Sequence, residues 1–199
     1  SVVKALDGLD GIKTLHLTSY GGSISSVARM SGRIANRMAQ FGEDHNQRRL
    51  TGIAYLTHLV PYYFAETRAM HYDTIVSDRD PIVDTLCYSA FYHPISSNAI
   101  RPPLKFMLEH VFNYPELFIY LESSPEVSLR RNAMRNNKQK QLHENIGALT
   151  MLKELFDREL FGLEMEGIKV ARINTDMKQL EDVIEEAKHL LGIKERTMI

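Results

Sequence analysis

Two groups of charged residues in this sequence have the chemistry that handling a phosphate group requires. Asp78 and Arg79 are adjacent, so a carboxylate that can hold a metal ion or orient a hydroxyl stands beside a guanidinium that can clamp a phosphate. Arg131 and Arg135 are four residues apart, which places both on one face of a helix. Because two neighbouring cations repel each other, an anion between them is stabilising. The pair therefore predicts a site for a phosphoryl group during transfer.

Each group also has a purely structural interpretation. Asp78 and Arg79 are equally typical of a surface ion pair, or of a cap for a helix that begins at Pro81. Arg131 and Arg135 are equally typical of the last turn of a solvated helix, where the helix dipole favours cations. Composition alone leaves both interpretations open.

Arg68, the histidines and Cys87 give weaker indications of a functional site. Arg68 lies near the end of a mostly apolar helix, where it either pairs with Glu66 or Asp73 or reaches into a cleft. The eight histidines show no metal-ligand spacing, so we expect no zinc site. Cys87 lies in an apolar helical segment, and we expect a buried, unreactive thiol.

Four short runs rich in β-branched and aromatic residues are the expected strands, at 13–18, 74–77, 117–121 and 168–173. They are nearly all apolar rather than alternating, which is typical of parallel strands buried on both faces. Between and after them lie helical patterns at 24–41, 50–71, 102–112, 124–135, 144–161 and 176–191. Ser124 and the Thr175-Asp176 pair are the expected starts of two of these helices. Strands separated by long helices predict an α/β fold, a three-layer α-β-α doubly wound parallel sheet in one domain.

Ligands bind at the carboxyl ends of the strands in such a sheet. The residues that follow the strands are therefore the expected site: 18–22, 78–80, 122–123 and 174–176. Within the first group, Gly21 and Gly22 either let the backbone approach a ligand or form a simple turn.

Composition restricts the partners of this chain. Its 199 residues are 44% hydrophobic and 25% charged, which is typical of one globular core. The formal net charge of −1 gives no overall field that would attract nucleic acid or an anionic membrane. A single cysteine excludes an intrachain disulfide and fits a reducing compartment. With neither a signal peptide nor a bilayer-spanning run, we expect a cytoplasmic protein that binds small molecules.

Taken in order, these segments resemble the thymidylate kinase family of P-loop nucleoside monophosphate kinases over nearly the whole chain. Residues 64–71 (FAETRAMH) resemble the family's F-A-x-D-R-A-x-H helix. Residues 75–79 (IVSDR) resemble its I-S-D-R-Y strand end. Residues 120–135 resemble its Y-L-D segment and the following P-E-V-A-L-x-R helix, which leads into an arginine-bearing lid. Three motifs in the right order make the resemblance specific.

This resemblance implies Mg²⁺-assisted transfer of the γ-phosphoryl group of ATP to a nucleoside monophosphate, thymidylate first. It also implies a lid around residues 130–145 and a homodimer. The roles that it implies are catalytic for Asp78, Arg131 and Arg135, metal-binding for Asp78, acceptor-binding for Phe64, Arg68, Arg79 and Tyr88, and ATP-binding for Ser1, Asn174 and Thr175.

The chain departs from the family on the acceptor side. Residues 18–20 (TSY) replace the family's R-E-P before the glycine pair, and Asp80 replaces the tyrosine after Asp-Arg. Two alternatives therefore stay open. One is a related kinase for a nucleoside or another small molecule, and the other is a nucleotide-binding protein without catalysis.

A second departure concerns the phosphate-binding loop. The pattern G-x-x-x-x-G-K-[ST] does not occur in the 199 residues, whereas residues 1–6 (SVVKAL) resemble the helix that follows such a loop. We therefore expect about 10 to 20 further residues before Ser1, carrying the loop and the strand at the middle of the sheet.

Overall fold

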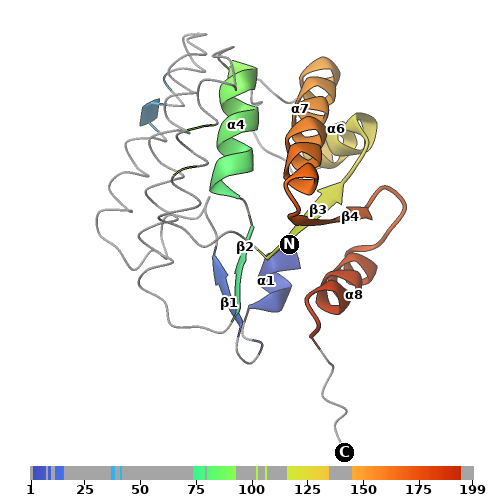
Figure 1. The fold of residues 1–199 in the computed structure, drawn as a ribbon. Coiled ribbons are helices and arrows are strands. Elements are labelled where there is room, and N and C mark those ends of the chain that lie inside the picture. The colour runs from blue at the N-terminus through green and yellow to red at the C-terminus, as the bar shows by residue number, and fades with distance from the viewer. Residues whose placement is uncertain are drawn as a thin grey trace, which may run out of the picture.

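The structure is a computed structural model, and it describes residues 2–7, 9, 12–15, 37–38, 41, 74–78, 80–92, 102, 106, 116–134 and 145–193. The helices with printed bounds are α1 (Val2–Leu6), α4 (Pro81–Tyr92), α6 (Pro125–Met134), α7 (Ile146–Met165) and α8 (Leu180–Leu190) (Figure 1). The strands are β1 (Ile12–Leu15), β2 (Thr74–Ser77), β3 (Leu117–Glu122) and β4 (Lys169–Asn174). Strands and helices thus form a mixed α/β fold.

All strand pairing among the described residues is parallel. β1 pairs with β2, with Ile12 opposite Thr74, and β3 pairs with β4, with Leu117 opposite Lys169. The order is therefore β1-β2 in one two-stranded sheet and β3-β4 in another, with no ladder between described residues of β2 and β3. Parallel strands and their approximate positions are confirmed, whereas a single continuous sheet is not seen in this part of the chain.

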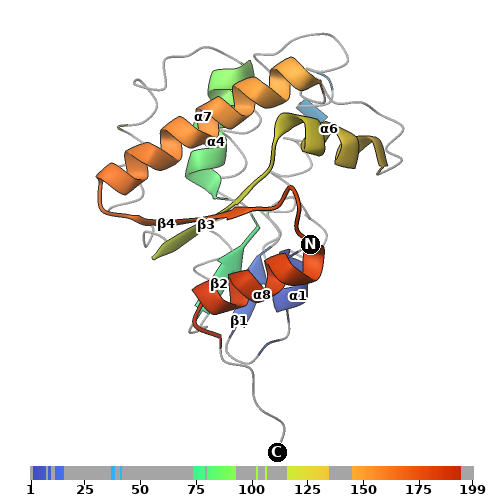
Figure 2. The same ribbon diagram turned by 90° about the vertical axis from the view of Figure 1, so that its right-hand side faces the viewer.

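Helices cover both faces of the β3–β4 pair. α4 and α7 lie on one face, and α1 and α8 lie on the other (Figure 2). Phe118 and Tyr120 pack into the cluster that α4 and α7 form, whereas Ile119 packs with Ile173 against α8. Because successive side chains in a strand point to opposite faces, the apolar run at 117–121 supplies both layers.

The strands themselves are less buried than their apolar composition predicts. Ile173 and Thr14 are buried, but Thr74 is exposed and Leu121 is 42% exposed. Interior strands of a parallel sheet are normally covered on both faces and paired on both edges. Each described pair has only two strands, and this leaves side chains such as Leu121 partly open.

The sequence explains how the two C-terminal helices end. α7 and α8 are each followed by a glycine with positive φ, Gly167 at 86° and Gly192 at 68°. In α7 the N–H of Gly167 donates to Glu164 O at 3.0 Å, and that of Ile168 donates to Leu163 O at 3.0 Å. These bonds satisfy carbonyls that the helix leaves unpaired, and the left-handed conformation needed for them favours glycine.

Two helix boundaries differ from the sequence prediction. α7 begins after Asn145, whose side chain accepts a hydrogen bond from Ala148 N at 3.0 Å, and it continues to Met165 rather than ending at 161. The prediction that Thr175 and Asp176 start the last helix is wrong, since α8 begins at Leu180. Both side chains are instead engaged by α6 and the segment before it, as described below.

Several predicted elements lie outside the described residues. The helices predicted at 24–41, 50–71 and 102–112 fall there almost entirely, although residues 37–38, 41, 102 and 106 are helical. Residues 135–144 of the lid predicted around 130–145 also lie there. Within the described ranges, no helix combines the length and apolar character needed to cross a membrane.

Cys87 is fully buried between α4 and α7, as the sequence predicts. Burial raises the pKa of its thiol well above the ordinary value, and the carboxylates of Asp84 and Glu159 add to this shift. The thiol is therefore protonated and unreactive at neutral pH.

Candidate functional site

The carboxyl ends of β3 and β4 are joined by one residue of the loop that follows β4. Thr175 is 8% exposed, and both its backbone N–H and its hydroxyl donate to the carbonyl of Glu122, at 2.8 and 3.0 Å. Glu122 is the last residue of β3 and lies opposite Asn174, the last residue of β4. The two strand ends are thereby fixed at the place where ligands bind in parallel α/β sheets.

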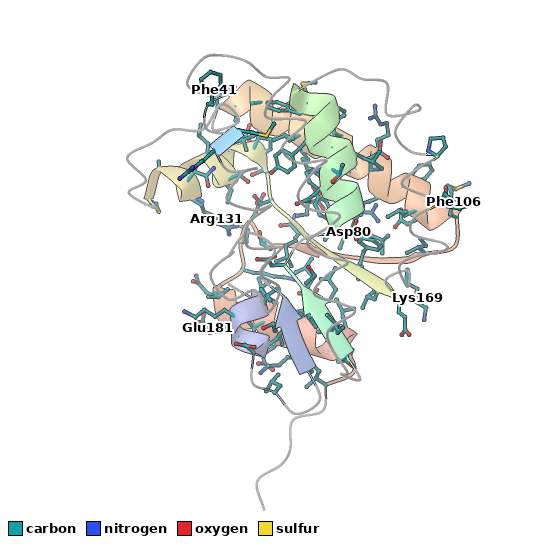
Figure 3. All side chains as sticks on the ribbon, turned by 90° about the vertical axis from the view of Figure 1, so that its left-hand side faces the viewer. Phe41, Asp80, Phe106, Arg131, Lys169 and Glu181 are labelled. Carbon is teal, nitrogen blue, oxygen red and sulfur yellow. The ribbon has the colours of Figure 1, made fainter. Side chains whose placement is uncertain are left out.

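The guanidinium of Arg131 is anchored on the same loop. Arg131 belongs to α6, the helix that follows β3 (Figure 3). Its Nη1 donates to Thr175 Oγ1 at 2.9 Å, and its Nη2 donates to Thr175 O at 2.6 Å. An arginine has five N–H groups, so three remain for an anion, and no described residue accepts a hydrogen bond from them.

A second contact ties the start of α6 to this loop. Asp176 Oδ1 accepts a hydrogen bond from Ser124 N at 2.9 Å. Ser124 in turn caps α6, since its hydroxyl accepts from Val127 N at 3.4 Å. Together with the Arg131 contacts, this bond explains why Thr175 and Asp176 do not start α8. Their polar groups serve α6 instead.

Lys153 is a charged residue of the site that the sequence prediction missed. Its ammonium group, on α7, lies 2.7 Å from Glu122 Oε1 and 2.7 Å from Asp157 Oδ2. Hydrogen bonds to Asp157 and Glu122 hold the pKa of Lys153 well above its ordinary value. Lys153 is therefore a permanent cation that fixes the carboxylate at the end of β3. Only its four-residue spacing to Asp157 was visible as a sequence signal.

At the end of β2, Asp78 and Asp80 have different surroundings. Asp80 Oδ1 accepts from Val83 N at 2.7 Å, so this carboxylate caps α4 (Figure 3). Asp78 is half-buried and directly follows the strand. The helix cap that the sequence allowed for this region is thus provided by Asp80.

Asp78 has the donor chemistry that Mg²⁺ prefers. Magnesium is usually held by one or two carboxylates together with phosphate oxygens and water. Within the described residues, no three or more His, Cys, Asp and Glu side chains gather into a group that could enclose a metal ion. Asp78, as a half-buried carboxylate at a strand end, offers one donor group of the kind that binds Mg²⁺.

Tyr88 lies in the helix packing beside this region. Its ring meets that of Phe156 edge to face, with centroids 6.1 Å apart and an interplanar angle of 83°. Tyr88 is two turns into α4, about 10 Å along the helix from its first residue, Pro81. Acceptor binding by this tyrosine stays a prediction.

The structure brings together three of the predicted site residues. Arg131, Asn174 and Thr175 lie at the joint end of β3 and β4. Asp78 lies at the end of β2, in the other strand pair. Tyr88 lies in α4, and the other predicted residues are outside the described ranges: Ser1, Phe64, Arg68, Arg79 and Arg135.

Comparison with known protein families finds no match for this chain, and no curated protein matches it either. Its function must therefore be argued from its own residues.

Proposed function

We propose that this chain is a thymidylate kinase-like enzyme of the P-loop nucleoside monophosphate kinase type. It would transfer the γ-phosphoryl group of ATP to a nucleoside monophosphate, with thymidylate as the first candidate. The observation that carries this proposal is the guanidinium of Arg131, which is fixed at the strand ends with three N–H groups left to bind an anion.

The arrangement of strands also supports the proposal. The strand orders β1-β2 and β3-β4 are what a five-stranded parallel sheet with β2 and β3 on either side of a central strand would leave. Helices on both faces of β3–β4 fit the three-layer α-β-α architecture. We therefore include in the proposal a doubly wound sheet with a parallel strand between β2 and β3.

In the proposed reaction the protein contributes position and charge. The acceptor phosphate attacks the γ-phosphorus of ATP in line, and ADP leaves, without a covalent enzyme intermediate. Arg131, and Arg135 by resemblance, would donate hydrogen bonds to the phosphoryl oxygens as charge develops on them. Asp78 would hold Mg²⁺, whose charge offsets that of the phosphates. Arg79, Arg68 and Phe64 would position the acceptor.

The end of β2 favours a second candidate, a related kinase with a different acceptor. Asp80 occupies the position of the family's tyrosine, and its carboxylate is engaged in capping α4. A negative charge there would repel the phosphate group of a nucleoside monophosphate bound close by. An uncharged acceptor, such as a nucleoside, would avoid this repulsion.

An acceptor panel with the full-length protein tests both candidates. ATP and Mg²⁺ would be incubated with thymidylate, other nucleoside monophosphates and thymidine, and products would be followed by ³¹P NMR. A nucleoside diphosphate as product supports the favoured function, whereas a monophosphate made from thymidine supports the second candidate. Tight ATP binding without turnover on any acceptor would show a binding protein and reject both.

Arg131→Ala should lower kcat about a thousandfold, because the charge on the transferred phosphoryl group loses its hydrogen-bond donors. Arg130→Ala is the matched control, since Arg130 is the exposed neighbour on the same helix. Far-ultraviolet circular dichroism would show that both variants are folded. Wild-type turnover in Arg131→Ala would exclude Arg131 from catalysis.

A further inference from the structure

We propose that Thr175 is a positioning residue that orients Arg131 for phosphoryl transfer. This role rests on the proposed kinase function, since Thr175 would affect the reaction by orienting Arg131. The hydroxyl of Thr175 lies between two polar groups: Glu122 O at 3.0 Å and Arg131 Nη1 at 2.9 Å.

The direction of these two hydrogen bonds is fixed. A hydroxyl has one hydrogen, and the carbonyl of Glu122 can only accept, so that hydrogen points to Glu122. The oxygen lone pairs of Thr175 are then left for Nη1 of Arg131, which can only donate. The carbonyl of Glu122, the last of β3, thereby orients the hydroxyl so that its lone pairs face the guanidinium of Arg131.

A second bond fixes the plane of the guanidinium. Nη2 of Arg131 donates to the backbone carbonyl of Thr175 at 2.6 Å, while Nη1 donates to the hydroxyl of the same residue. Two bonds from two nitrogens to two oxygens stop the planar group from rotating. Because Thr175 is 8% exposed, water has little access to compete for these bonds.

Fixing the plane also fixes the donors that remain. Each terminal nitrogen keeps one N–H, and Nε keeps its own. Nε–H and the remaining N–H of the terminal nitrogen on its side form a rigid fork of the kind that binds two phosphate oxygens. Arg131 can hold Thr175 and a phosphoryl group at once in one fixed plane, because its donors are spread over three coplanar nitrogens.

The single hydrogen of the Thr175 hydroxyl is donated to Glu122, so the hydroxyl has no hydrogen to offer a nucleotide. Removing this hydroxyl should therefore lower kcat, because it leaves Arg131 less well oriented. We expect Thr175→Val to lower kcat about 10- to 100-fold with the KM for ATP little changed, because a misplaced catalytic group costs rate rather than ground-state binding. Thr175→Ser, which keeps the hydroxyl, should restore most of the rate. Thr150→Val is the matched control, since the hydroxyl of Thr150 bonds only within α7.

A double mutant separates positioning from direct contact. If Thr175 acts through Arg131, Thr175→Val should have no further effect on kcat in the Arg131→Ala background. An equal loss in both backgrounds, or wild-type kcat in Thr175→Val, would overturn the proposal.

A readout that does not need turnover keeps this inference separate from the kinase function. In ¹⁵N NMR spectra of the full-length protein, Nη1 and Nη2 of Arg131 should give separate signals, because their hydrogen bonds to two different oxygens slow rotation about the Nε–Cζ bond. Thr175→Val should collapse them, and Thr175→Ser should not. If no acceptor is phosphorylated but these signals behave as expected, the proposed function fails and the orienting role stands. Unchanged signals in Thr175→Val would overturn the orienting role itself.

Discussion

Lys153 is the residue that most directly connects the end of β3 to the helix that covers it. Lys153→Met removes the cation between Glu122 and Asp157 and leaves two carboxylates facing each other. We expect the free energy of unfolding to fall by about 1 kcal/mol, as for a partly exposed charged hydrogen bond. Urea denaturation would measure the change.

Lys178→Met is the control for this substitution. Lys178 pairs with Glu186 in a more exposed setting, where ion pairs contribute little. Equal losses in the two variants would show that Lys153 has no special structural role.

Tyr120 predicts how stability responds to alkaline pH. Burial raises the pKa of Tyr120 to about 12, and the nearby carboxylate of Asp157 adds to the shift. In the unfolded chain a tyrosine ionises at about 10. Between these two values the folded protein keeps a proton that the unfolded chain has lost, so the free energy of unfolding falls as the pH rises. Tyr120→Phe should flatten this decline in urea titrations at pH 9 to 11.5. An equally steep decline in the variant would contradict the assigned pKa.

At the scale of elements, α7 shows how one helix face builds the core. Leu160 is 3% exposed and belongs to the cluster with Leu152 and Leu155, whereas Phe161, the next residue, is 60% exposed. Leu160→Ala should lower the free energy of unfolding by about 2–5 kcal/mol because it leaves a cavity. Phe161→Ala should change it far less, and similar losses would contradict this burial pattern.

Elements were predictable from the sequence wherever a local pattern determines them. The strand at 74–77 is found as predicted, and that at 117–121 is one residue longer, because β-branched and aromatic runs favour buried strands. The predicted start of α8 was wrong because Asp176 does not cap that helix. Its carboxylate accepts a hydrogen bond from Ser124, which is far away in the sequence.

In the candidate site, too, individual residues were predictable from the sequence, whereas the contacts between distant residues were not. Arg131 and Thr175 were predicted as separate residues of one site, from their positions after strands and from a family resemblance. That they bond each other depends on the pairing of β3 with β4, which no local pattern specifies. Lys153 was missed because a lysine on an amphipathic helix is normally solvated, and its partner Glu122 belongs to a different element.

At the scale of the whole molecule, the backbone of β3 bears on how the two strand pairs are related. Thr175 N donates to Glu122 O, so the backbone of Glu122 faces β4. Backbone polar groups alternate between the two edges of a strand, so those of Ile119 and Leu121 face the other edge, away from β4. Ile119 is half-buried against α8, and an unpaired N–H there would cost about 1–3 kcal/mol.

The two edges of β3 can be compared by the hydrogen exchange rates of its backbone amides. If a parallel strand lies between β2 and β3, the amide of Ile119 should exchange in the full-length protein as slowly as that of Tyr120, which faces β4. Exchange followed by ¹H–¹⁵N NMR compares two adjacent amides under one set of conditions. Fast exchange at Ile119 with protection at Tyr120 would mean that β3 is an edge strand, and it would remove the central strand from the proposed fold. Protection at both would support a continuous sheet, because a paired partner on each edge slows the exchange of adjacent amides together.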